Sequence, residues 1–217
     1  MARDTEILSL KVADTQAELI VAGDDRPLLL PADSVATRGL AKGARLSAAL
    51  LGELRAESDY FLCERDAARM LAMREHSVGE LRDKLQHRKH ARHDINKAVL
   101  KYRRQGLLDD ARYARRTAEN LLSLKPCGQV FVVATLRRKR IGRQLAEEIA
   151  DEVCRDQDET ELAVAALAKR WNALKQFDLE VARRKAYSYL SRRGFGYEAA
   201  RTAFEELQRR QNEVPSD

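Results

Sequence analysis

The sequence has few of the residues that mark several large classes of protein. Its 217 residues include three cysteines, four prolines and ten glycines, and 6% of the chain is aromatic. It lacks any run of about 18 apolar residues, which excludes a membrane-spanning helix of ordinary length. The first residues also lack the basic and then apolar pattern of a signal peptide, so we expect a soluble, cytoplasmic protein.

The cysteines are too few and too scattered to form a framework. Cys63, Cys127 and Cys154 are odd in number, lie far apart and include no Cys-x-x-Cys pair. This spacing argues against a disulfide scaffold and against a thiolate metal site, so we expect three reduced thiols. With 34% of residues charged, the shortage of aromatic residues, proline and glycine favours many exposed helical faces over a compact sheet protein.

Sequence motifs of the common enzyme classes are also missing. There is no Gly-x-x-x-x-Gly-Lys loop, no Gly-x-Gly-x-x-Gly turn and no Gly-x-Ser-x-Gly elbow. Asp109 and Asp110 are adjacent, but a helix cap followed by a first-turn acid explains both. We expect no enzyme activity, no catalytic residues and no cofactor.

Three histidines are close enough in the sequence to be candidate metal ligands. His87, His90 and His93 are spaced by three, but they straddle a predicted turn and lie among basic residues that disfavour a divalent cation. We expect no metal site here, and a metal-dependent enzyme at this turn is the least favoured alternative.

Charge is distributed unevenly along the chain. Between Arg82 and Arg143 there are 18 basic and 5 acidic residues, a net charge of +13, whereas residues 1–60 and 144–217 each carry −3. A block of one sign repels itself in the folded protein, and an anionic polymer as partner offsets that repulsion. The alternative is a solvated helical surface that is basic without a partner.

The first part of the chain is predicted to be β-rich. Three short runs of branched and apolar residues, the last bracketed by prolines, favour a hairpin or a three-stranded ribbon. These runs are Glu6–Val12, Ala17–Ala22 and Arg26–Pro31. A short helix capped by Asp33 or Ser34 is expected to follow and to reach Arg38. From Asp59 the apolar period changes to 3.6, which predicts a first long helix to about Arg74.

The rest of the chain repeats a three-helix pattern. Equivalent leucines in the second helix of each unit are Leu85, Leu136 and Leu190, spaced by 51 and 54 residues. Each precedes a basic or polar helix end. Ile141 and Phe195 come five residues beyond the leucine in the second and third units, whereas in the first unit we expect one extra residue in the turn at 90–93.

These patterns predict a mainly α protein. It consists of three tandem three-helix repeats in an elongated array with a small N-terminal β-ribbon. The predicted segments are the extension (1–57), repeat one (58–108), repeat two (109–156) and repeat three with the C-terminal tail (157–217). Gly106 is expected to end the first repeat in a left-handed conformation, and Asp109 to cap the first helix of the second.

Clusters of basic residues are the candidate binding residues. They are Arg88, Lys89, Arg103, Arg104, Arg115, Arg116, Arg137, Arg138, Lys139, Arg140, Arg143, Arg192 and Arg193. Arginine dominates, which suits bidentate contact with phosphates or carboxylates. No adjacent aromatic ladder is visible, and Tyr102, Tyr113 and Phe131 are interpreted as core residues. Contacts to nucleic acid are therefore expected to be mostly to the backbone and weakly sequence-specific.

Three motifs carry a resemblance to a known family. Ser77–Leu85, Gly106–Ala114 and Tyr189–Glu198, in this order and at this spacing, resemble the RecX family of bacterial recombination regulators over about residues 64–208. The resemblance implies binding to the RecA recombinase on DNA, along the groove of the filament. It also implies restraint of filament growth, ATP hydrolysis and strand exchange.

The resemblance and the charge pattern together suggest partners. We expect a monomer that binds the recombinase filament, and single- and double-stranded DNA through phosphate contacts, without a membrane. Two alternatives stay open: a free-standing DNA-binding module that acts without recombinase, because three-helix units can imitate helix-turn-helix domains, and a helical scaffold for another acidic protein.

Overall fold

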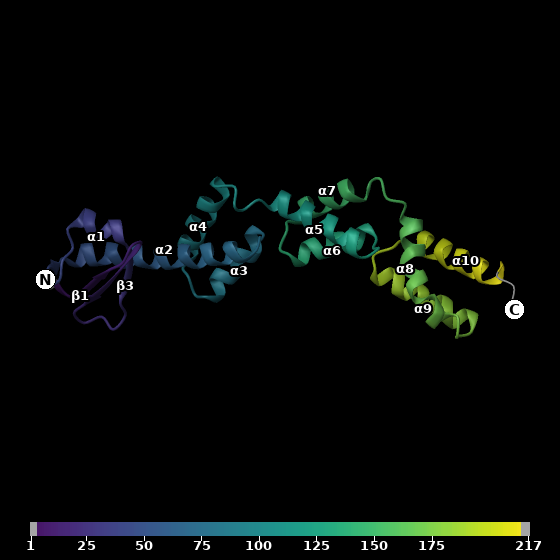
Figure 1. The fold of residues 1–217 in the computed structure, drawn as a ribbon, viewed down its shortest axis with the longest axis horizontal. Coiled ribbons are helices and arrows are strands. Elements are labelled where there is room, and N and C mark those ends of the chain that lie inside the picture. The colour runs from purple at the N-terminus through teal and green to yellow at the C-terminus, as the bar shows by residue number, and fades with distance from the viewer. Residues whose placement is uncertain (1–3, 214–217) are drawn as a thin grey trace. The chain divides into compact units, whose positions relative to one another are not determined.

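The protein is mainly helical with a small N-terminal sheet, which confirms the predicted fold class. The structure, a computed structural model, describes residues 4–213, in which there are ten helices and four strands (Figure 1). Two compact units are present. Among the described residues, unit 1 holds 4–76 together with Glu80–Leu108, and unit 2 holds Ser77–Gly79 together with 109–213. No helix within 4–213 has the length and apolar character needed to cross a bilayer.

Unit 1 begins with a four-stranded antiparallel sheet of order β3-β2-β1-β4. The strands are β1 (Thr5–Val12), β2 (Gln16–Val21), β3 (Leu28–Pro31) and β4 (Arg45–Leu46). The predicted ribbon had three strands at most. The fourth forms because Gly43, at φ 84°, turns the chain so that the Ile7 amide donates to the Ala44 carbonyl at 2.9 Å. A two-residue strand is too short to show an alternating pattern in the sequence.

Helix α1 (Ala32–Arg38) follows β3 directly. Its cap position is Pro31, not the predicted Asp33 or Ser34, and it ends at Gly39 in the left-handed region. The Arg38 guanidinium donates to the Ser34 hydroxyl, so this serine bonds within the helix rather than at its start.

Helix α2 (Ala48–Met73) connects the sheet to the helical part of unit 1. It starts well before the predicted Asp59, because the Ser47 hydroxyl caps it by accepting from the Leu50 amide at 3.2 Å. Gly52 lies exposed inside the helix, although glycine is a weak helix former. Leu54 is buried in the core of the sheet, and the Ser58 hydroxyl accepts from the Leu29 amide of β3 at 2.9 Å.

Helices α2 to α10 form three groups of three. The first is α2 with α3 (Val78–His87) and α4 (Arg92–Arg104), the second is α5 (Asp110–Leu124), α6 (Gln129–Arg138) and α7 (Arg143–Cys154), and the third is α8 (Glu159–Leu174), α9 (Leu179–Arg192) and α10 (Tyr197–Glu213). Helix α4 packs on α2, where the Tyr102 hydroxyl donates to the Glu64 carbonyl at 3.2 Å. The second and third groups each enclose their own buried core, around Leu136 and Leu190 respectively. The four-part division at 57, 108 and 156 stays a prediction.

The turn after the second helix has the same geometry in all three groups, which confirms the predicted register of the leucines. The amide five residues beyond each leucine donates to the leucine carbonyl: His90 to Leu85, Ile141 to Leu136 and Phe195 to Leu190, at 3.1–3.3 Å. The next helix begins seven residues after the leucine each time. The expected extra residue in the first turn is therefore wrong. The place of Ile141 and Phe195 is taken by His90, whose polar ring is instead bonded to Asp66 at 2.9 Å.

The link between α4 and α5 is a helix stop followed by a helix start, as predicted. Gly106 has φ 70°, and the amides of Leu107 and Leu108 return to the Tyr102 carbonyl at 2.9 and 3.2 Å. The Asp109 carboxylate accepts from the Arg112 amide at 3.0 Å. The αL residue and the cap together satisfy polar groups at both helix ends.

Candidate functional site

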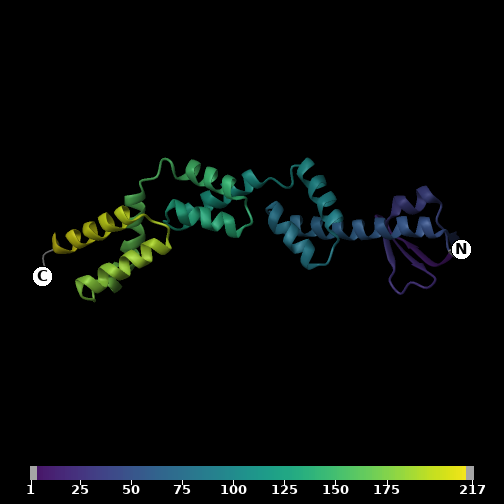
Figure 2. The same cartoon turned by 180° about the vertical axis from the view of Figure 1, so that it is seen from behind.

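A recurring contact holds the basic helix ends in unit 2. The Ser77 hydroxyl donates to the Lys139 carbonyl at 2.5 Å, and the Gly128 amide donates to the Arg193 carbonyl at 2.9 Å. Ser77 and Gly128 are equivalent, because each lies eight residues before its leucine, and Lys139 and Arg193 each lie three residues after theirs. In both views of the fold the turn between α9 and α10 lies beside the start of α6 (Figures 1 and 2).

Close backbone approach makes this contact rigid. A Cβ atom on Gly128 would lie 2.1 Å from the Gly194 carbonyl oxygen, and one on Gly79 would lie 2.5 Å from Cβ of Arg140. Only glycine fits at such distances. The two turns of unit 2 are thus positioned by backbone atoms rather than by their basic side chains.

We define the basic turns as residues 87–89, 138–140 and 192–194, two to four residues beyond the repeat leucines. The third residue after the leucine is a cation in every group: Arg88, Lys139 and Arg193. The fourth is in the left-handed region each time, with φ 64° at Lys89, 62° at Arg140 and 77° at Gly194. Non-glycine residues rarely adopt this conformation, so two cations are held there by the surrounding turn.

Two predicted binding residues stabilise the fold instead of standing free. The Arg137 guanidinium donates to the Ile141 carbonyl at 3.0 Å, across its own turn. The Arg193 guanidinium donates to the Pro126 carbonyl at 3.2 Å and lies over the Tyr189 ring at 5.6 Å from its centre.

Three other predicted residues form ion pairs with carboxylates. These pairs are Arg88–Asp66 at 2.9 Å, Arg115–Glu152 at 2.8 Å and Arg143–Glu147 at 2.8 Å. The bond from Arg115 lowers the pKa of Glu152, which outweighs the opposing effect of desolvation. Burial acts to raise the pKa of Asp66, but hydrogen bonds from His90 and Arg88 outweigh it and the pKa is lowered.

The other predicted residues lie largely at the surface. Arg138 donates to the Thr135 hydroxyl at 3.0 Å, and Arg192 donates to the Ser188 hydroxyl at 2.6 Å. Within residues 4–213 the side chains of Lys89, Arg103 and Arg104 have no hydrogen bond or ion pair. Arg116, Lys139 and Arg140 have further contacts; Arg116 and Arg140 are exposed and Lys139 is half-buried.

The histidines and cysteines have separate environments. His87 bonds to the Asp83 carbonyl at 2.6 Å, and His93 lies 3.2 Å from Asp94. In the described part of the chain no three His, Cys, Asp or Glu side chains gather as a metal site would require. The three cysteines are free, as expected, and burial raises the pKa of Cys63 to about 12. That thiol stays protonated at neutral pH and is a poor nucleophile.

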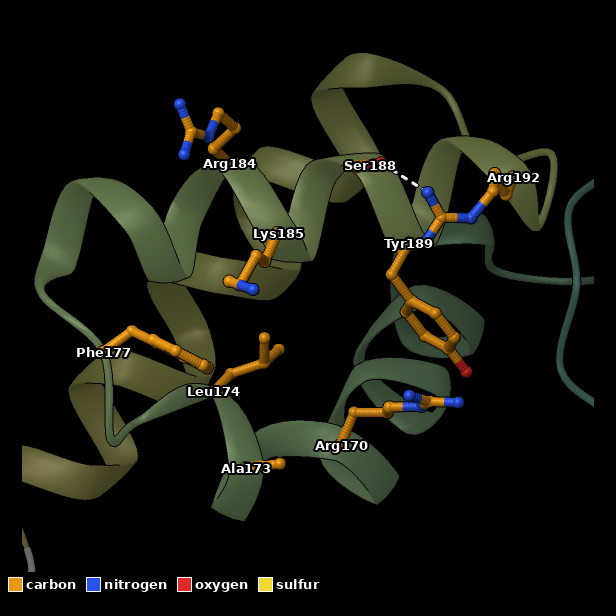
Figure 3. A pocket seen from close by; sticks show the side chains of 9 residues that line it. All are labelled: Arg170, Ala173, Leu174, Phe177, Arg184, Lys185, Ser188, Tyr189 and Arg192. Atoms are coloured by element: carbon orange, nitrogen blue, oxygen red, sulfur yellow. Dashed lines mark hydrogen bonds between the residues drawn. The ribbon is translucent and has the colours of Figure 1, made fainter.

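A basic groove between α8 and α9 was missed in the sequence. It encloses about 540 Å³ and is lined by Arg170, Ala173, Leu174, Phe177, Arg184, Lys185, Ser188, Tyr189 and Arg192. Arg170 and the Tyr189 ring point toward one another, Lys185 lies near Phe177, and Arg184 extends away from α9 (Figure 3). We call these nine residues the α8–α9 groove.

One signal for this groove was present in the sequence. Its α9 residues recur at helical spacing from Arg184 to Arg192 and thus share one helix face. The opposite wall, with Arg170 and Phe177 from α8 and its end, comes from a separate helix and could not be assigned from spacing. The structure also places aromatic rings beside cations here, where the sequence showed no aromatic ladder.

Comparison with known proteins gives related folds and sequences. A crystal structure of regulatory protein RecX superposes with a TM-score of 0.69 at 16% identity, over 93% of this chain and 99% of that one. Regulatory protein RecX of Pelodictyon phaeoclathratiforme is 30% identical over 137 residues, which are 63% of this chain and 83% of that protein. The chain belongs to the RecX family.

Further matches agree with this assignment. A family model described as the third three-helix domain of RecX matches residues 156–204. Regulatory protein RecX of Chlorobium phaeobacteroides is 31% identical over 65% of this chain and 90% of that protein. The crystal structure of RecX from Lactobacillus salivarius has a TM-score of 0.60 at 22% identity, over 69% of this chain and 97% of that one. The chain is thus a regulatory protein of the RecX type.

Proposed function

We propose that this RecX-family protein binds the RecA recombinase filament on DNA along its groove. Bound there, it restrains filament growth, ATP hydrolysis and strand exchange, and acts as a regulator without catalytic residues of its own. Support comes from the relatives named regulatory protein RecX and from the basic turns.

The recurrence of a cation at one position of each three-helix group carries this proposal. Arg88, Lys139 and Arg193 follow their leucines by the same three residues, in turns of the same geometry. Arg88 and Arg193 are held by Asp66 and the Pro126 carbonyl, so contact with the filament falls to the exposed cations beside them, Lys89, Arg138 and Arg192. A filament offers a similar anionic surface at each of its subunits, so a repeated cation matches it better than a single patch would.

The regulatory effect needs only a modest bias. A protein that bridges successive subunits favours one state of the filament by its differential affinity for that state. A difference of about 1.4 kcal/mol in binding free energy changes the equilibrium constant tenfold. A few contacts between this protein and one state of the filament therefore suffice.

The test is ATP turnover by recombinase on single-stranded DNA. Adding this protein should lower turnover, and unchanged turnover at stoichiometric excess would contradict the proposal. The double variant K89E/R138E reverses two exposed cations of the basic turns and should raise the half-maximal inhibitory concentration about tenfold, or about 1.4 kcal/mol.

A matched control keeps the same change in net charge. R201E/R209E reverses two arginines of α10 that are already paired with Glu198 and Glu206. Its inhibition should stay close to that of the unmodified protein. Tight binding of duplex DNA with no effect on recombinase would instead favour the free-standing DNA-binding module.

A further inference from the structure

We propose that the α8–α9 groove binds single-stranded nucleic acid, with phosphates on its four cations and a base against Phe177. This inference rests on the proposed function, because it gives the strand contact of that regulator a place in the third three-helix group. The four cations are Arg170, Arg184, Lys185 and Arg192, and no carboxylate is among the residues that line the groove.

Ion pairing is absent from the groove but common on its surroundings. Arg183, next to Arg184 on α9, pairs with Glu180 at 2.7 Å, and Arg201 of α10 pairs with Glu198 at 2.8 Å. By contrast, in the described chain the Arg184 side chain has neither a hydrogen bond nor an ion pair. Uncompensated like charges in one concave site raise the local potential and attract an anion.

Aromatic rings hold two of the cations without using up their donors. The Arg170 guanidinium lies 5.2 Å from the centre of the Tyr189 ring, and the Lys185 ammonium lies 4.4 Å from the centre of the Phe177 ring. A cation over a ring face is attracted to it, while its N–H groups remain available to oxygen acceptors. The rings therefore position donors for phosphate oxygens before a ligand arrives.

Phe177 distinguishes a single strand from other polyanions. Its side chain is 46% exposed at the groove, beside the buried Leu174. Base faces are covered in a duplex but open in a single strand, where stacking on an aromatic ring stabilises binding. An acidic peptide would use the cations and gain little from the ring. The observed combination of ring and cations thus favours the single strand.

The first experiment measures binding of a fluorescent oligothymidylate to the full chain by anisotropy, without recombinase. R184E/K185E should weaken binding at least tenfold and reduce the slope of log K against log salt by about 1.4, since two phosphate contacts are lost. R201E/R209E, with an equal change in net charge, should change the affinity less than about twofold. Equal effects of the two variants would overturn the proposal.

The second experiment tests the ring. F177A should weaken oligothymidylate binding about tenfold with the salt slope unchanged, because stacking involves no released counterion. F177Y keeps an aromatic face and should restore most of the affinity. Circular dichroism establishes that each variant is folded. If F177A binds like the unmodified protein, the ring takes no part and the proposal fails.

Competition experiments distinguish the other ligands that could occupy the α8–α9 groove. Unlabelled oligothymidylate should displace the probe well, while duplex of the same length and poly-glutamate should displace it poorly. Equal displacement by poly-glutamate would assign the groove to acidic protein and overturn the proposal. The recombinase assay is a separate measurement. If the unmodified protein lowers ATP turnover and R184E/K185E loses strand binding, both proposals are supported. If R184E/K185E binds the strand normally and ATP turnover still falls, the groove is rejected and the proposed function stands.

Discussion

His76 is a buried side chain whose protonation is linked to folding. It is 3% exposed; its Nδ1 lies 2.9 Å from the Arg74 carbonyl, and its Nε2 lies 2.9 Å from the Lys84 ammonium. These partners favour the neutral ring that donates from Nδ1 and accepts at Nε2. Burial lowers the pKa of His76, and the charges of Arg74 and Lys84 lower it further, against the opposing effects of the Arg74 carbonyl and Glu80.

A pH-dependent stability follows from this depressed pKa. The unfolded chain binds a proton at His76 near pH 6.5, whereas the folded protein does so only at lower pH. Stability should therefore fall as pH drops from about 6.5 toward the folded pKa, and should carry no contribution from His76 above that window. H76Q should flatten this fall in urea unfolding followed by circular dichroism.

The control is H87Q, which changes an exposed histidine of α3. It should keep the pH profile of the unmodified protein. Asp66 does not confuse the result, because its pKa is lowered and its contribution is lost only below about pH 4. If the stability of H76Q falls between pH 7 and 5 as much as that of the unmodified protein, His76 is not the cause of the fall.

The cationic residues can be read directly from the sequence, but the partner that each side chain contacts could not be predicted from it. Arg193 donates to Pro126 and Arg115 pairs with Glu152 across separations of 67 and 37 residues. Such partners depend on packing between helices, and a helical period carries no information about them. The unpaired state of Arg184 is equally a property of the assembled groove.

At the scale of elements, the contact at Gly128 gives a direct test of close packing. Gly128 and Gly142 both occupy helix cap positions, of α6 and α7. Alanine is a poorer cap than glycine, so both substitutions should cost about 1 kcal/mol or less from that source. G128A should cost about 1–3 kcal/mol more, because its Cβ would lie 2.1 Å from the Gly194 carbonyl oxygen, whereas space around Gly142 is open.

Urea denaturation of the two glycine variants measures this difference. Similar costs for G128A and G142A would show that the helix start and the turn separate easily. That result would remove the basis for treating the turn as held in place.

Helix periods and caps were the most predictable features of the elements. The Asp109 cap and the leucine register were found because each depends on residues within one or two turns. The start of α2 was missed because Gly52 is a common helix breaker, and only burial of Leu51 and Leu54 against the sheet compensates its weak propensity. Strand β4 depends on pairing with β1, a long-range contact that two residues cannot signal.

For the whole molecule, the division into two compact units predicts separable unfolding. Trp171, the only tryptophan, packs edge-on against Phe204 and so reports on unit 2. L190A in unit 2 and L54A in unit 1 each remove a fully buried side chain and should cost about 2–5 kcal/mol. L190A should shift the tryptophan fluorescence midpoint in urea, whereas L54A should shift only part of the circular dichroism transition.

The double variant provides the check. Its effects should add, since the two sites share no partners. If L54A moves the fluorescence midpoint as far as L190A does, the two units unfold as one and this expectation is wrong.

The Lys139 and Arg193 carbonyls that receive Ser77 and Gly128 have an evolutionary consequence. Every residue type has a main-chain carbonyl, so exchanging either side chain leaves the acceptor in place. The glycines at these contacts are restricted by space, Gly79 and Gly128 on one side and Gly194 in the turn itself. A lineage can therefore exchange the side chains at 139 and 193 without losing these two backbone acceptors. Exchange of side chains with retention of backbone contacts explains how the fold is shared with a RecX crystal structure at 16% identity.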